Sequence, residues 1–251
     1  MRQGTEQLRT LSAAAPQDVL TARRLALAEE RQAEILRANG DDATALSLDQ
    51  SALQVLRTLS AAQPHNTDFL DLQGFAEFDL ADQLDHMRRF GEAERYGAAA
   101  RASFRSLSAA DPKIGQYHIG AGRALIVMAK TAVDEGRPAQ ARPLVAESLN
   151  ELSQAAPTQH GSADFQFATA AAESLLGDVY QTLAARATNS QRERLRDWQS
   201  AKQWYVRAVD AFPTSFADAT AQATADKGQI LRCDQEVART QSAARARSGR
   251  R

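Results

Sequence analysis

One nine-residue phrase recurs along the chain at a nearly constant interval. It reads LRTLSAAAP at its first occurrence and LRTLSAAQP at its second, which ends at Pro64. A third version, FRSLSAADP, ends at Pro112, and a looser one, LNELSQAAP, ends at Pro157. A regular period in this range predicts stacked copies of one supersecondary unit. The central leucines that define the period are Leu11, Leu59, Leu107 and Leu152.

Each unit is predicted to contain two helices. Apolar residues recur three and four positions apart throughout, and they do not alternate as they would in a strand. In the first complete unit, Gly40 breaks the first helix, and Asp41 or Asp42 can cap the second. The proline at the end of the phrase stops the second helix, because proline cannot continue it.

Small side chains recur at a heptad spacing in every second helix. This spacing keeps them on one face of a helix, where they allow a neighbouring helix to approach closely. The abundance of alanine and the low aromatic content, 6%, favour the same close packing. The four pairs are Ala45 and Ala52, Ala93 and Ala100, Ala141 and Ser148, and Ala201 and Ala208.

The period divides the chain into repeats. We expect a half repeat with a second helix only, four complete repeats, a C-terminal capping helix and a basic disordered tail. In that order, the predicted segments are 1–16, 17–64, 65–112, 113–157, 158–213, 214–243 and 244–251.

The last repeat is longer than the others, because it carries an insertion between its two helix signatures. We interpret the extra residues as extensions of both helices around a turn at Asn189–Ser190. In the capping helix, Ser215 and Asp218 resemble a capping box. The apolar side chains predicted to face the preceding helix are Ile230, Cys233 and Val237.

Composition excludes several classes of protein. The formal net charge of −1 gives no general attraction to nucleic acid or to a membrane surface. The N-terminus lacks the apolar run of a signal peptide, and no stretch approaches the ~20 apolar residues of a membrane span. The single cysteine, Cys233, cannot form an internal disulfide. We therefore expect a cytoplasmic protein that binds neither nucleic acid nor membrane.

No motif of catalysis stands out. The four histidines form no i, i+4 pair, and no cysteine–histidine spacing suggests zinc. Gly120-x-Gly122 lacks the strand and the third glycine of a dinucleotide site, so we expect small residues at a helix crossing there. The serines of the phrase have no GxSxG context. The sequence therefore predicts no catalytic residue, no cofactor and no metal site.

The last repeat resembles the tetratricopeptide repeat. AKQWYVRAVDAFP places Ala201, Tyr205, Ala208 and Pro213 at the second-helix positions of that family, and LGDVY supplies its first-helix signature. The other repeats lack the aromatic residue, and the period is ~45–48 residues rather than 34. The resemblance implies an all-α, right-handed superhelix of antiparallel helix pairs that acts as a protein-interaction scaffold.

The long, alanine-rich repeats also resemble the C-terminal regions of bacterial serine/threonine protein kinases. The alternative function is therefore a regulatory or docking fragment of such a kinase, and a chain that opens in mid-repeat is consistent with this reading. A regulator with an upstream DNA-binding domain is a third hypothesis. The chain contains no kinase signature, so we do not expect it to be an enzyme by itself.

The resemblance implies a concave groove lined by the first helices that holds a peptide or a partner helix. The stripe Glu34, Asp82, Lys130, Asp178 is mostly acidic, which favours a basic partner over a terminal carboxylate. Phe75 and Phe78 would anchor an apolar side chain. The other predicted groove residues are Glu30, Asp85, His86, Arg123, Ile126, Ser174 and Gln181.

The half repeat suggests a second contact. Leu8 and Leu11 belong to a second helix that has no first helix of its own. We therefore expect self-association through this segment.

Overall fold

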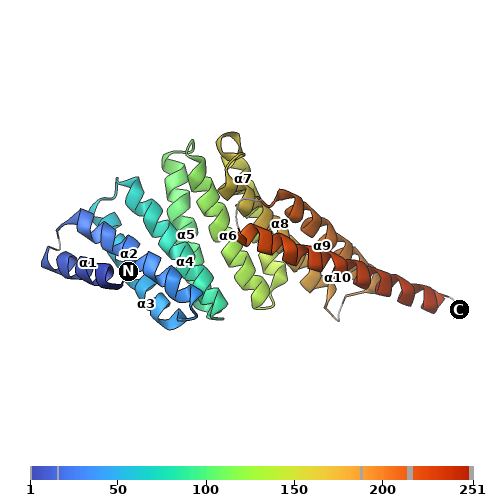
Figure 1. Ribbon diagram of the computed structural model, residues 1–251. Helices are drawn as coiled ribbons and strands as arrows, with labels where there is room; N and C mark the ends of the chain where they lie inside the picture. Colours follow the sequence, from blue (N-terminus) through green and yellow to red (C-terminus); the bar gives the residue numbers. More distant parts are fainter. Residues whose placement is uncertain (1, 16, 187–188, 214–216, 249–251) are drawn as a thin grey trace. The chain divides into compact units, whose positions relative to one another are not determined.

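Ten α-helices and no strand make up the part of the chain that the computed structural model describes, residues 2–15, 17–186, 189–213 and 217–248 (Figure 1). The predicted all-α class is confirmed. The helices are α1 Arg2–Ala14, α2 Val19–Ala38, α3 Asp42–Ala62, α4 Thr67–His86, α5 Phe90–Ala110, α6 Gly115–Asp134, α7 Pro138–Gln159, α8 Ala163–Ala184, α9 Gln191–Ala211 and α10 Ala217–Ser248.

Helices that follow one another in the chain pack against one another, as a helical repeat requires. The pairs α2–α3, α4–α5 and α8–α9 are helix pairs of single repeats. Contacts of α1 with α2, α3 with α4, α7 with α8 and α9 with α10 connect neighbouring repeats. The predicted period is visible in the starts of α2, α4, α6 and α8, which follow one another at equal intervals along the chain. The chain divides into two compact units, Met1–Ala124 and Leu125–Arg251, which we call unit 1 and unit 2 and describe separately.

Local signals place the turns where the sequence predicts them. Gly40 has a φ of 79°, a left-handed conformation that glycine adopts without strain. Asp41 caps α3 by accepting a hydrogen bond from the Thr44 amide at 3.2 Å. Ser190 caps α9 through a reciprocal capping box with Glu193, which confirms the predicted turn before α9.

The small side chains of the second helices lie in the core. Every member of the four predicted pairs is completely buried, so they form the contact surface that their spacing predicts. Pro64 and Pro112 follow the ends of α3 and α5. Pro157 differs, because α7 continues beyond it to Gln159. The helix nevertheless ends within that last turn, as the missing proline N–H leads one to expect.

Glycine is needed where aromatic rings press on a first helix. In unit 1, the ring of Phe104 lies against Gly74 and Gly120, and a Cβ atom at Gly120 would come within 2.5 Å of that ring. In unit 2, the ring of Tyr205 lies against Gly177 in the same way. The interpretation of Gly120 as a small residue at a helix crossing is confirmed.

The last complete pair uses a shifted second helix. In α3 and α5, the first small residue lies in the first turn, at Ala45 and Ala93. In α9 the corresponding residue, Ala201, lies in the middle of the helix. With 21 residues, α9 is as long as α3 and α5, so it is shifted toward its N-terminus and not lengthened, whereas α8 has 22 residues where α4 has 20. The predicted extension is therefore wrong for α9 and amounts to two residues in α8.

The repeated phrase also carries a polar contact between helix pairs. Arg9 of α1 pairs with the buried Glu29 of α2 at 2.6 Å, and Arg57 of α3 pairs with the buried Glu77 of α4 at 2.9 Å. The two arginines are one repeat period apart, and so are the two glutamates. The first two copies of the phrase therefore tie their own helix to the next first helix, in addition to their apolar packing.

Helix α10 packs on α9 through the predicted apolar residues. Cys233, Ile230 and Val237 form a cluster with Trp198 and Tyr205 of α9. The helix continues to Ser248, beyond the end of the predicted segment 214–243. The predicted capping residue Ser215 and the final residues 249–251 of the predicted tail lie outside the described residues.

Candidate functional site

The predicted groove residues of unit 1 gather on α2, α4 and the first half of α6. The Arg123 guanidinium lies 4.5 Å from the centre of the Phe78 ring and 5.9 Å from that of Phe75. These distances are those of cation–π contacts. Phe75 also meets Phe104 edge to face, at 5.0 Å between ring centres. The aromatic pair is therefore fixed on one side by the buried ring of Phe104 and contacts a cation, Arg123, from α6.

Three partly or fully buried carboxyl groups interact beside the predicted groove residues of unit 1. Burial, together with the charges of Asp79 and Asp49, raises the pKa of Glu30 to about 8. Burial also raises the pKa of Asp79 to about 6, against the opposing effect of Arg123 and Arg37. The pKa of Asp49 is raised to about 6 by burial, although Arg37 forms an ion pair with it.

The remaining acidic groove residues of unit 1 differ in accessibility. Glu34 is exposed and pairs with Arg31 at 2.6 Å. Asp82 lies 3.5 Å from His86 one turn later. Asp85 is buried, so its carboxyl group does not line an open surface. Glu30, Glu34 and Asp82 thus share this side of unit 1 with Asp79, which the sequence analysis did not select.

In unit 2, the predicted groove residues of α8 are engaged with neighbouring helices. The Ser174 hydroxyl donates to Asp226 Oδ1 of α10 at 3.0 Å. The Tyr205 hydroxyl donates to Asp178 at 2.7 Å and approaches Gln181 Oε1 at 3.4 Å. Burial raises the pKa of Asp178 to about 6, and the hydrogen bond from Tyr205 opposes that effect. This polar cluster serves helix packing in unit 2.

Two predicted residues lie on the second half of α6. Ile126 and Lys130 belong to unit 2, and both are half-buried. The acidic and aromatic groove residues that the structure brings together are therefore those of unit 1.

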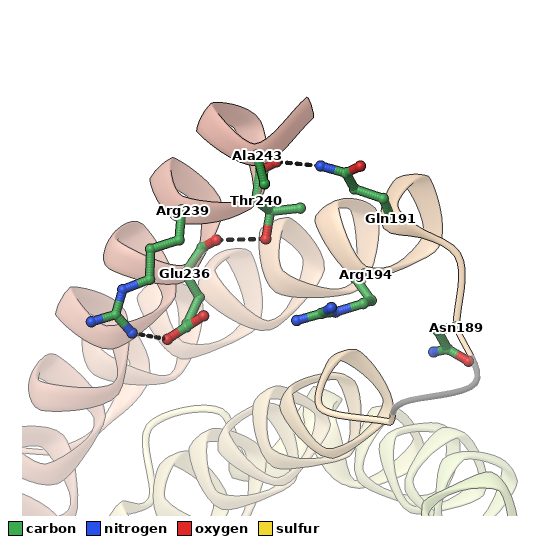
Figure 2. Close-up of a pocket in the computed structure, with 7 residues that line it drawn as sticks. All are labelled: Asn189, Gln191, Arg194, Glu236, Arg239, Thr240 and Ala243. Atoms are coloured by element: carbon green, nitrogen blue, oxygen red, sulfur yellow. Dashed lines mark hydrogen bonds and ion pairs between the residues drawn. The ribbon is translucent and has the colours of Figure 1, made fainter. Parts of the chain in front are cut away.

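A separate polar hollow of about 450 Å³ lies between the start of α9 and the second half of α10 (Figure 2). Gln191 bridges the two helices by donating to the Thr240 carbonyl at 2.6 Å. The Thr240 hydroxyl donates to the Glu236 carbonyl, and Arg239 pairs with the Glu236 carboxylate. The hydroxyl in this lining is thus bonded to the helix backbone, so the described lining residues form no nucleophile–base pair.

The described residues contain neither a cluster of potential metal ligands nor a membrane-spanning helix. Within them, no group of three or more histidine, cysteine or acidic side chains is arranged to hold a metal ion. No helix in the same residues is both long and apolar enough to cross a membrane.

Comparison with known proteins does not assign the chain to a family. Neither the protein-family models nor the curated proteins that we compared with the chain give a match. The residues of the site therefore have to be interpreted from their own geometry.

The titration of Glu30 leads to a stability prediction. Its pKa in the folded protein, about 8, is higher than in an unfolded chain, about 4.3. The folded state therefore binds this proton more tightly, and stability falls as pH rises from about 4 to 8. We expect Glu30→Gln to stabilise unit 1 by about 1 kcal/mol at pH 8 and to have little effect at pH 4.

Thermal unfolding of both proteins across this pH range checks the expectation. Glu34→Gln is the matched control, because Glu34 is exposed on the same helix. Equal effects of the two substitutions at pH 8 would contradict the role of burial at Glu30.

Proposed function

We propose that the chain is a protein-interaction scaffold that binds a basic peptide or partner helix on the α2–α4 face of unit 1. We call this surface the acidic face and define it by Glu30, Glu34, Phe78, Asp79 and Asp82. It combines four carboxyl groups with an aromatic ring that Arg123 already contacts. The fold supports a binding role, since stacked helix pairs present extended surfaces.

The observation that carries the proposal is the cluster of neighbouring carboxyl groups on α2 and α4, two of which have raised pKa values. Glu30 and Asp79 are partly buried, the charge of Asp79 raises the pKa of Glu30, and burial dominates the shift of both pKa values. A lysine or arginine from a partner would add positive charge beside these groups and favour the ionised carboxylates. Binding would then release protons, and it should strengthen as pH rises from about 6 to 8.

Two finer readings belong to this proposal. A tetratricopeptide-like character is supported in the last pair, where Tyr205 packs on Gly177 of LGDVY. The alternative, a docking region of a serine/threonine kinase whose catalytic domain is not in this chain, rests on the resemblance alone. Both interpretations imply a scaffold that binds another protein. We therefore propose the binding function and assign the chain to neither family.

A peptide selection followed by charge neutralisation tests the function. Random peptides displayed on phage are selected on the whole chain, and we expect arginine and lysine to be enriched. The double variant Asp79→Asn, Asp82→Asn should bind the best synthetic peptide at least roughly tenfold more weakly, because the carboxylates that meet its cation are gone. Fluorescence anisotropy measures the dissociation constants.

A second double variant separates local contact from net charge. Asp210→Asn, Asp218→Asn changes the formal charge equally, but at exposed positions of α9 and α10. Binding should be nearly unchanged in this control. Equal weakening in both variants, or a selection without basic residues, would contradict a basic partner on the acidic face.

A further inference from the structure

A cation of the chain itself lies near the carboxyl groups of the acidic face. The Arg123 guanidinium is centred 4.5 Å from the centre of the Phe78 ring, the shorter of its two ring contacts. Burial raises the pKa of Asp79, and the charge of Arg123 is the strongest effect that opposes this rise. Arg123 therefore interacts both with the aromatic ring and with a carboxyl group of the same surface.

The repeat indicates that helix packing does not require an arginine at this position. Helices α2, α4, α6 and α8 start at equal intervals, so the ninth residue of each helix holds the same place. These residues are Leu27, Phe75, Arg123 and Ala171. Three of them are apolar, and none of the four is fully buried. The other first helices thus pack without a cation here, which points to a role for Arg123 at the surface.

Arg123 is held differently from two other arginines near these carboxyl groups. Arg31 pairs with Glu34 at 2.6 Å, and Arg37 pairs with Asp49. Among the residues that the structure describes, Arg123 forms no ion pair, and its guanidinium is held by the two aromatic rings. A cation–π contact at a half-buried site is weak. A second guanidinium can therefore compete with Arg123 for the ring.

We propose that Arg123 is an internal competitor on the acidic face, which a partner displaces by placing an arginine side chain of its own on the Phe78 ring. This inference rests on the proposed function. The contact made by Arg123 shows that a guanidinium fits against Phe78. A guanidinium is planar and stacks on aromatic rings, whereas the ammonium group of lysine is compact and strongly hydrated. The partner is therefore narrowed from a basic peptide to an arginine-containing one.

The competition also sets a threshold for binding. The arginine of a partner reaches the ring only in the fraction of molecules from which Arg123 has moved away, which lowers the apparent affinity. A segment with a single basic side chain gains little, because it replaces one cation–π contact by another. A segment with several arginines also meets the carboxylates of Glu34 and Asp82 and so displaces Arg123. The competitor thus discriminates against weakly basic segments.

Fluorescence anisotropy with labelled oligoarginine and oligolysine peptides of equal length tests the competition on the whole chain. The titrations are performed at about pH 8, because the pKa of Asp79 is about 6 and its carboxyl group is then ionised. The unaltered chain should bind oligoarginine more tightly than oligolysine. Arg123→Gln should tighten oligoarginine binding roughly fivefold, because it frees the ring, and it should tighten oligolysine binding less.

Two further variants separate the ring from net charge. Arg105→Gln removes the same charge from an exposed position of α5, and it should change the dissociation constant less than roughly twofold. In a Phe78→Leu chain, Arg123→Gln should give a clearly smaller gain, because the contested ring is absent. Circular dichroism verifies that all variants are folded. Equal gains with and without the ring would overturn the competition.

Nuclear magnetic resonance of the unaltered chain follows the displacement directly. The Nε–H signal of Arg123, assigned by its loss in Arg123→Gln, carries a shift caused by the neighbouring rings. Saturating oligoarginine should move this signal toward its position in the Phe78→Leu chain. An unchanged signal with the peptide bound would contradict displacement of Arg123.

The results separate this inference from the proposed function. If Asp79→Asn, Asp82→Asn weakens oligoarginine binding but Arg123→Gln does not tighten it, the acidic face binds a basic partner and the competitor role is wrong. If neither peptide binds to the unaltered chain or to Arg123→Gln, both proposals are wrong. Binding of oligoarginine to Arg123→Gln alone would support both.

Discussion

Gly177→Ala is expected to destabilise unit 2 by about 2–3 kcal/mol, because the new methyl group overpacks a closed core. A Cβ atom at this position would lie 2.5 Å from the ring of Tyr205. The ring cannot easily move away, since it is fully buried and its hydroxyl is bonded to Asp178. The higher helix propensity of alanine offsets only about 1 kcal/mol of this cost.

A glycine elsewhere in unit 2 supplies the control. Gly228 lies in α10 with no atom within 4 Å of a built Cβ. Gly228→Ala should therefore stabilise the helix by up to about 1 kcal/mol, so the same substitution has opposite signs at two positions. Urea unfolding of both variants measures the difference. Stabilisation by Gly177→Ala would show that the ring relaxes, and the proposed rigidity at Tyr205 would be wrong.

Arg57→Ala is expected to destabilise unit 1 by about 2 kcal/mol, because it leaves the buried Glu77 without its cation. The estimate is below that for a fully buried pair, since Arg57 is partly exposed to water. Glu77 would keep its hydrogen bonds from Gln73 and Ser103, which limits the loss.

Arg105 is the matched control for Arg57. It occupies the same place in the third copy of the phrase, but the position of the buried glutamate is taken by Leu125 in the sequence. Arg105 is exposed. Arg105→Ala should change stability by less than about 0.5 kcal/mol in the same urea titration. A similar loss in both variants would show that the arginine acts through its aliphatic stem rather than through Glu77.

Much of the fold could be predicted from the sequence because its signals are local and repeated. The regular spacing of leucine and proline defines the units, and the small residues at heptad spacing define the packed face of each second helix. Gly40 and Ser190 specify turns through their own backbone and side-chain chemistry. Each of these features depends on the residues of one helix or one turn, so it can be predicted from the sequence alone.

The candidate site was harder to predict because its properties arise from several helices at once. Asp79 and Asp49 were not selected, although burial alters their pKa values and their charges raise that of Glu30. Ser174 and Asp178 were placed in a groove, but contacts from α9 and α10 engage them. A signal for the Arg57–Glu77 pair was present, since the arginine and the glutamate both recur with the period of the repeat.

The identical LRTLSAA segments of α1 and α3 also create an ambiguity during folding. Because both segments offer the same apolar face and the same arginine, a nascent α1 can pair with α4 in the place of α3, with Arg9 on Glu77. This competing pairing is a source of frustration in the folding landscape, and between two chains it becomes a route to domain swapping. What discriminates against it is the N-terminal part of α3, outside the duplicated segment, where Ala45 and Leu46 are buried. The first turns of α3 thus distinguish it from α1 and favour its pairing with the correct neighbouring helix.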